Sequence, residues 1–293
     1  MVLFILFPGF GNSEKYWENK IDMKKNKVYL KKLDFLNNLK KIGKVYKYTP
    51  KLHNLNYYRT GINEEYGKIY CNQFNKPTKI TLDDINIDKE CKRIFDLLKD
   101  KNEKFILIGH SIGSWFAYNF SKMYPSYCLN TIFLDGSFLV LESINNIRNR
   151  YVKKQKKVNI KFKDINNKKL DFLYKKVISH VKEDRYEYNK KINKYIKKIF
   201  DISLNYYYYT MKKKFNSKLK IPNISFRNLN FNKEKKSIDH YTNIDAVNNE
   251  EELYNKNKNK AIVHYLVNSG HTQWKRKKFS DFIIKEIKEY LKK

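Results

Sequence analysis

Hydrophobic residues along the chain gather in short runs separated by polar or amphipathic stretches. Each run is about four to seven residues long, and most end near glycine, proline or asparagine, as is typical of strands. The runs of this kind are 2–7, 44–48, 104–108, 131–134, 221–226 and 261–267. Helical patterns lie between several of them, and such alternation predicts an α/β fold with a mostly parallel sheet flanked by helices.

Four helices are expected in this alternating part of the chain. A short one is capped by Asn12 or Ser13, and a second follows a capping pattern that begins at Thr81. The third covers 114–120, directly after a strand, and the fourth ends the chain. The C-terminal helix carries apolar residues at helical spacing, namely Phe279, Ile283, Ile287 and Leu291.

The alternation stops between residues 138 and 220. This segment contains neither glycine nor proline, and its apolar residues recur at helical spacing, as at Leu170, Leu173 and Val177. We therefore predict a largely helical cap, 138–220, inserted into a core built from 1–137 and 221–293. The tyrosines at 206–209 are interpreted as packing under this cap, since aromatic stripes usually lie in a core.

The strand at 104–108 leads into Gly109-His110-Ser111-Ile112-Gly113 and then into a helix. A Gly-x-Ser-x-Gly turn between a strand and a helix is typical of a nucleophile elbow. Side chains at Gly109 or Gly113 would clash with the neighbouring strand or helix, so only glycine suits these positions. The pattern predicts that Ser111 is presented above the sheet edge as a nucleophile.

A serine hydroxyl needs a base to take its proton. Among the six histidines, His271 follows the last predicted strand and precedes the last helix, so it should lie at the carboxyl end of the sheet. His264 falls inside a strand, and His110 should point away from the nucleophile. We therefore expect His271 to be the general base.

An acyl-transfer intermediate needs backbone donors for its oxyanion. The N–H of Ile112 follows the nucleophile directly and is one expected donor. The second is expected from the glycine-containing turn after the first strand, Pro8-Gly9-Phe10-Gly11, with the N–H of Phe10 as the candidate.

Three segments together resemble the α/β-hydrolase superfamily. They are Phe7–Gly11, Gly109–Gly113 and Ser269–His271, and they occur in the order found in that superfamily. The resemblance implies a two-step acyl transfer in which Ser111 attacks a carbonyl, His271 shuttles the proton and water releases the acyl group. The chain departs from the pattern at Pro8, where the superfamily usually has histidine.

The acid that orients the base is less clearly marked. The resemblance implies a carboxylate shortly after the strand that follows the cap, yet this strand leads into Asn230, Phe231 and Asn232. Asp239 is the first aspartate beyond them and is the first choice. Asp135, at the end of the preceding strand, is the alternative position in the superfamily. Asp245, Glu234 or an asparagine are the other possibilities.

Charge and composition bear on partners and location. The net charge is +32, and the predicted cap holds 24 basic and 7 acidic residues. Only seven of the 62 basic residues are arginine, a profile more typical of AT-rich coding than of selected phosphate contacts. Weak association of the cap with an anionic membrane or with nucleic acid is still expected. Three cysteines without metal spacing, and no leader segment, favour a cytoplasmic location.

Taken together, the sequence predicts a cytoplasmic serine hydrolase acting on a small-molecule carboxylic ester or thioester. No metal cluster, phosphate loop or dinucleotide fingerprint occurs, so no cofactor is expected. The alternative is a non-catalytic protein of the same fold that binds a ligand or a polyanion. The sequence predicts neither the acyl group nor the oligomeric state.

Overall fold

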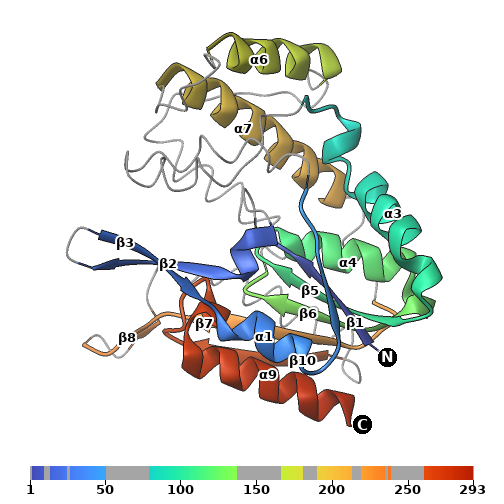
Figure 1. The fold of residues 1–293 in the computed structure, drawn as a ribbon, viewed down its shortest axis with the longest axis vertical. Helices are drawn as coiled ribbons and strands as arrows, with labels where there is room; N and C mark the ends of the chain where they lie inside the picture. Colours follow the sequence, from blue (N-terminus) through green and yellow to red (C-terminus); the bar gives the residue numbers. More distant parts are fainter. Residues whose placement is uncertain are drawn as a thin grey trace.

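A sheet of six parallel strands runs through the computed structural model (Figure 1). The strand order is β10-β7-β6-β5-β1-β4, so the first strand lies inside the sheet and the last lies at an edge. The strands are β1 Val2–Phe7, β4 Lys44–Lys47, β5 Lys104–His110, β6 Cys128–Leu134, β7 Asn223–Leu229 and β10 Ala261–Val267. All six correspond to strands predicted from the sequence.

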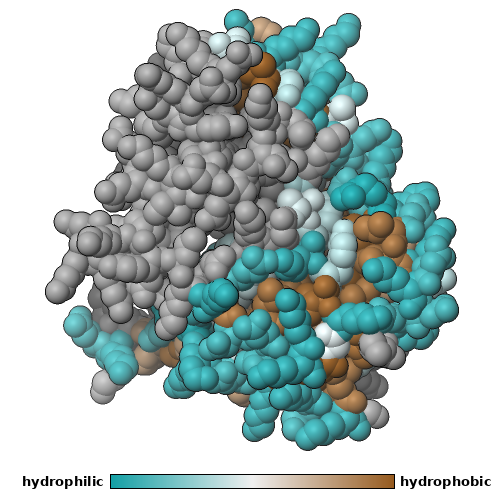
Figure 2. Space-filling view, viewed as in Figure 1, coloured by the Kyte–Doolittle hydropathy of each residue, from teal (hydrophilic) through white to brown (hydrophobic). Residues whose placement is uncertain are grey.

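The structure describes residues 2–9, 14–24, 27–50, 79–136, 166–180, 190–212, 219–234, 237–238 and 261–292. Among these, no helix is both long and apolar enough to cross a membrane. Figure 2 shows hydrophilic residues over most of the described surface on one face, in keeping with the net charge of +32.

The central strands are buried on both faces, which explains why they appear in the sequence as continuous apolar runs. In β1, Ile5 and Phe7 face one core, whereas Phe4 and Leu6 face the other. The same alternation holds along β5. Two hydrophobic cores therefore lie on opposite faces of one sheet, as the two-residue period of a strand requires.

Helices cover both faces (Figure 1). Those on the first face are α3 Ile87–Leu98 and α4 Gly113–Met123; those on the second are α1 Asp34–Lys40 and α9 Lys277–Leu291. The chain also contains 3₁₀ turns: η1 Glu14–Trp17, η3 Asp83–Ile85, η4 Lys99–Lys101, η5 Pro125–Tyr127 and η8 Gln273–Lys275. The α/β fold class predicted from the alternating pattern is confirmed.

Two helices are described within segment 138–220: α6 Asn167–His180 and α7 Lys190–Lys212. They lie together beyond the α3 and α4 side of the sheet, at the top of Figure 1. Tyr207 of α7 is buried, and its ring meets Phe116 of α4 edge-on at 5.6 Å between centroids. This contact agrees with the interpretation of that tyrosine as a packing residue, and it joins α7 to the first core.

Three elements between Trp17 and Lys44 were not predicted from the sequence. Strands β2 Asn19–Lys24 and β3 Lys27–Lys32 form an antiparallel hairpin, and α1 follows it. The connection between these two strands contains no glycine, so the usual sequence signal of a tight hairpin is missing. A second short pair, β8 Phe231–Asn232 with β9 Ser237–Ile238, was also not predicted.

The cap of α3 differs from the prediction. The Asn86 side chain accepts hydrogen bonds from the N–H groups of Asp88 and Lys89 and is therefore the N-cap. The Thr81 hydroxyl instead donates to Asp84 at 2.9 Å, before the 3₁₀ turn η3. The predicted capping pattern thus forms its own turn, several residues ahead of the helix.

Candidate functional site

The turn between β5 and α4 has the backbone of a nucleophile elbow. Ser111 has a φ of 53°, a left-handed conformation that is costly for a residue with a Cβ. A Cβ added to Gly113 would lie 2.2 Å from the Phe7 carbonyl oxygen, and one added to Gly109 would lie 2.5 Å from Ser114 Cα. Both glycines are therefore required by close backbone contacts, as the sequence predicts.

The expected oxyanion donors are described only in part. Ile112 immediately precedes the first residue of α4, where backbone N–H groups have no partner within the helix. Gly9 lies against the elbow, since a Cβ added there would be 3.4 Å from Ser111 Cβ. Phe10, the second predicted donor, lies outside the described residues.

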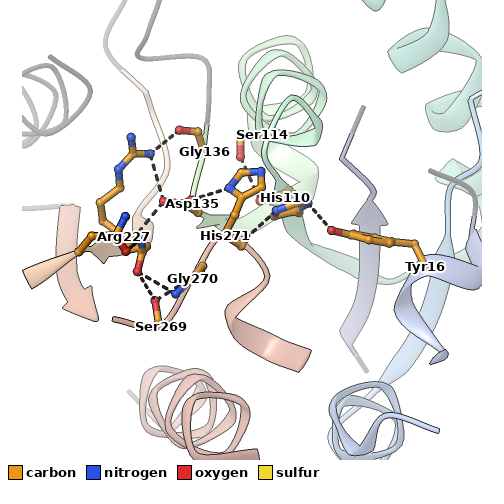
Figure 3. Close-up of polar contacts among 12 residues, drawn as sticks. Tyr16, His110, Ser114, Asp135, Gly136, Arg227, Ser269, Gly270 and His271 are labelled. Atoms are coloured by element: carbon orange, nitrogen blue, oxygen red, sulfur yellow. Dashed lines mark hydrogen bonds and ion pairs between the residues drawn. The ribbon is translucent and has the colours of Figure 1, made fainter. Parts of the chain in front are cut away.

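His271 and Asp135 form a short hydrogen bond at the carboxyl end of the sheet (Figure 3). His271 Nδ1 lies 2.5 Å from Asp135 Oδ2. The His271 side chain is about half exposed (55%), whereas that of Asp135 is mostly buried (13%). An exposed imidazole held by a buried carboxylate leaves its other ring nitrogen available for proton transfer.

The Asp135 carboxylate is fixed by its backbone and by strand β7. Asp135 has a φ of 47°, and its N–H donates to the Phe226 carbonyl at 2.8 Å. The N–H of Asn228 donates to Asp135 Oδ1 at 3.2 Å, and Arg227 Nη1 lies 3.5 Å from the same oxygen. Oδ1 is thus held by β7, and Oδ2 is directed to His271.

Asn228 also holds the segment that carries the histidine. Its side-chain oxygen accepts hydrogen bonds from the Gly270 N–H at 2.8 Å and from the Ser269 hydroxyl at 3.1 Å. Its main-chain N–H donates to Asp135. Asn228 therefore contacts Asp135 directly and also holds the two residues that precede His271. This arrangement fixes the distance between the two loops.

His110 lies fully buried beside Ser111, and both ring nitrogens have partners. Nε2 is 2.9 Å from the His271 carbonyl oxygen, and Nδ1 is 3.2 Å from the Tyr16 hydroxyl. Burial, together with the nearby His271 and Lys275, lowers the pKa of His110 well below its ordinary value. His110 is therefore neutral at pH 7.

Of the acid candidates, Asp135 is the one that the described residues bring to His271. Glu234 is exposed at the turn after β8. Asp239, the first choice from sequence, and Asp245 both lie outside the described residues.

Arg227, Asn228 and Tyr16 were not anticipated as parts of the site. An arginine directly after the predicted strand 221–226, followed by asparagine, was the available sequence signal. Arg227 is buried in the structure, and a buried arginine is rare unless it is paired with an acidic group. An arginine at this position therefore pointed to a buried acidic partner.

Three further residues, His264, Cys91 and Cys128, lie away from this site. His264 stacks on Phe226 at 5.1 Å and faces Glu286, and burial lowers its pKa. Cys91 and Cys128 are buried free thiols. Within the described ranges, no group of three or more His, Cys, Asp or Glu side chains could hold a metal ion.

No protein-family model matches the chain, and no curated protein matches its sequence. Solved structures do match. A marine microorganism esterase is 15% identical with a TM-score of 0.51, covering 98% of this chain and 94% of that chain. The monoacylglycerol lipase of Paleococcus ferrophilus is 11% identical with a TM-score of 0.50 and the same coverage, 98% and 94%.

A third similar structure comes from work on the carboxylesterases of the thaumarchaeon Nitrososphaera gargenis. It is 14% identical, with a TM-score of 0.51, and the match covers 99% of this chain and 91% of that chain. Together with the parallel sheet order and the strand-turn-helix at Ser111, these matches show that the chain has the α/β-hydrolase fold. The resemblance predicted from three short segments is confirmed at the level of the fold.

Proposed function

We propose that this protein is a serine hydrolase that cleaves carboxylic esters or thioesters through an acyl-enzyme. The observation that carries the proposal is the 2.5 Å contact of His271 Nδ1 with Asp135 Oδ2, at the same end of the sheet as the strained Ser111 turn. Nucleophile, base and orienting acid are the three groups this chemistry needs.

Each residue has a defined role in the proposed reaction. His271 takes the proton of the Ser111 hydroxyl as Oγ attacks the substrate carbonyl, and the carboxylate of Asp135 stabilises the imidazolium that forms. The N–H groups of Ile112 and Phe10 donate to the oxyanion. As the intermediate collapses, the bond to the leaving group breaks and His271 returns the proton to that group.

Release of the acyl group repeats these steps with water. His271 removes a proton from water, whose oxygen attacks the acyl carbonyl, and Ser111 leaves with the proton returned by His271. The half-exposed position of His271 supports this step because water can reach the imidazole. The products are a carboxylic acid and an alcohol or thiol.

Asp135 replaces Asp239 as our preferred acid. The support is the direct contact to His271 and the fixation of the opposite carboxylate oxygen by Asn228 and Arg227. The usual position of the acid, shortly after the strand that follows the cap, is occupied here by Asn230, Phe231 and Asn232.

Steady-state hydrolysis of short p-nitrophenyl esters and acyl thioesters tests the proposal. Wild-type protein is expected to turn over at least one of them, and Ser111→Ala is expected to lose turnover while keeping its circular dichroism spectrum and melting temperature. Ser126→Ala, in the exposed 3₁₀ turn η5, is the matched control. Equal turnover by wild type and Ser111→Ala would contradict the proposal.

A further inference from the structure

His110 lies between two segments that the proposed reaction needs on either side of Ser111. The first comprises Gly9, just after β1, and Tyr16 in the turn η1. The other carries His271. His110 reaches both, through Tyr16 on the first and through the His271 carbonyl on the second (Figure 3).

The hydrogen-bond partners define how His110 is protonated. A carbonyl oxygen only accepts, so Nε2 must carry the hydrogen and donate it to His271 O at 2.9 Å. Nδ1 then accepts the hydroxyl proton of Tyr16 at 3.2 Å. One neutral tautomer therefore satisfies both contacts, and neither nitrogen is left for proton transfer with Ser111.

The ring is also enclosed on its remaining sides. A Cβ added to Gly9 would lie 2.6 Å from His110 Nδ1, so the main chain after β1 packs directly on the imidazole. The Trp274 ring meets it edge-on at 4.3 Å, and the His271 ring lies 4.5 Å away. Sliding either segment relative to the elbow would break at least one of these contacts.

From these contacts we infer that His110 is a positioning residue, which ties Gly9, Tyr16 and the His271 segment to the elbow and thereby sets the place of the general base. The expected effect of His110 on the reaction rate rests on the proposed function. The positioning itself is a property of the fold.

Two substitutions of His110 distinguish its hydrogen bond to the His271 carbonyl from its hydrogen bond to the Tyr16 hydroxyl. In His110→Gln the terminal amide reaches the place of Nε2 and still donates to the His271 carbonyl. In His110→Asn the shorter amide stays near the place of Nδ1 and loses that contact. His264→Asn, the same change on the edge strand β10, is the matched control, and Tyr16→Phe removes only the hydroxyl.

The first measurement is the second-order rate constant for fluorophosphonate labelling, together with kcat and KM for an activated ester. His110→Asn is expected to lower labelling and kcat roughly a hundredfold with KM changed by no more than about threefold, because small displacements of a base cost rate rather than binding. His110→Gln is expected to recover to within roughly tenfold of wild type. Folded His110→Asn that labels as fast as His264→Asn would overturn the inference.

The second measurement does not depend on turnover. The proton shared by His271 Nδ1 and Asp135 should give a strongly deshielded NMR signal. We expect this signal in wild type and His110→Gln, and its loss or displacement in His110→Asn. If wild type fails to react with the probe, the proposed function fails while this signal still tests positioning; an unchanged signal in His110→Asn contradicts positioning.

If His110→Asn does not fold, Tyr16→Phe carries the test. It leaves the ring and its contacts with Trp274 and Lys275 in place and removes one donor to His110. Labelling roughly tenfold slower, with an unchanged melting temperature, supports the inference, and labelling equal to wild type contradicts it.

Discussion

Arg227 Nη1 lies 3.5 Å from Asp135 Oδ1, the carboxylate oxygen opposite the one that contacts His271. The same nitrogen donates to the Gly136 carbonyl at 2.6 Å, so the guanidinium joins the end of β7 to the end of β6. Both side chains are largely buried. The pair therefore fixes the carboxylate at a place where an unpaired charge would be costly.

Arg227→Met is expected to lower the free energy of unfolding by about 3 kcal/mol, because it leaves the Asp135 carboxylate buried without its cation. Urea denaturation followed by tryptophan fluorescence measures this change. The control is Lys277→Met, which removes an exposed ion pair with Asp281 and should lower stability far less, because solvent screens the pair. An equal loss of unfolding free energy in the two variants would contradict the larger contribution expected from the buried pair.

Asp135→Asn is expected to reduce kcat roughly 10³- to 10⁴-fold, because the amide cannot stabilise the imidazolium of His271. Asp239→Asn is expected to reduce kcat by no more than about threefold on this account. Ester hydrolysis by the two purified variants, compared at equal concentration of folded protein, decides between the two carboxylates. The reverse ranking would assign the acid to Asp239.

Gly113→Ala is expected to cost about 3 kcal/mol or more of stability, because the new methyl group meets the Phe7 and Pro8 carbonyl oxygens at 2.2 and 2.6 Å. Gly270→Ala is the comparison. Gly270 has a φ of 74°, but the space beside it is open as far as Arg276 at 3.5 Å, so only backbone strain of about 1 kcal/mol is expected. Thermal melts of both variants measure the difference, and equal costs would contradict the close contact at the elbow.

Stability should fall in mild acid because of His110. Its pKa is well below 6.5 in the folded protein, owing first to burial and then to the neighbouring His271 and Lys275. Below about pH 6.5 the unfolded chain therefore binds one more proton than the folded chain at this site, and the free energy of unfolding decreases as pH falls. Above that pH, this contribution is fully present.

The slope contributed by His110 should approach about 1.4 kcal/mol per pH unit below pH 6.5. Tyr16, His271 and Lys275 are the titratable groups that face the ring. Denaturation of wild type and His110→Gln between pH 5 and 8 isolates the slope. His264→Asn controls for the other histidine whose pKa burial lowers. The same slope in wild type and His110→Gln would contradict the assignment.

Much of the fold could be predicted because the strands in the middle of the sheet are buried on both faces. Val2–Phe7 and Lys104–His110 therefore show as apolar runs. The elbow glycines are required by close backbone contacts, to Ser114 in the same turn for Gly109 and to Phe7 of β1 for Gly113. Hairpin β2–β3 could not be predicted in this way because it lies outside the six-stranded sheet and lacks a glycine turn.

The candidate acids for His271 could not be ranked from the sequence, because their positions depend on how separate strands pair. Whether Asp135 or a later aspartate reaches the imidazole depends on how β6 and β7 lie beside each other, with Leu134 opposite Phe226. That register brings Asn228 and Arg227 to the Asp135 carboxylate. Sequence spacing carries no information on this pairing across strands.

The most direct test of the account is mass spectrometry of the protein after reaction with a fluorophosphonate probe. We expect one adduct on Ser111 in wild type, none in Ser111→Ala, and labelling slowed at least roughly a thousandfold in His271→Ala. A folded wild-type protein that gains no adduct, or gains it on another residue, would contradict the claim that Ser111 is an activated nucleophile served by His271.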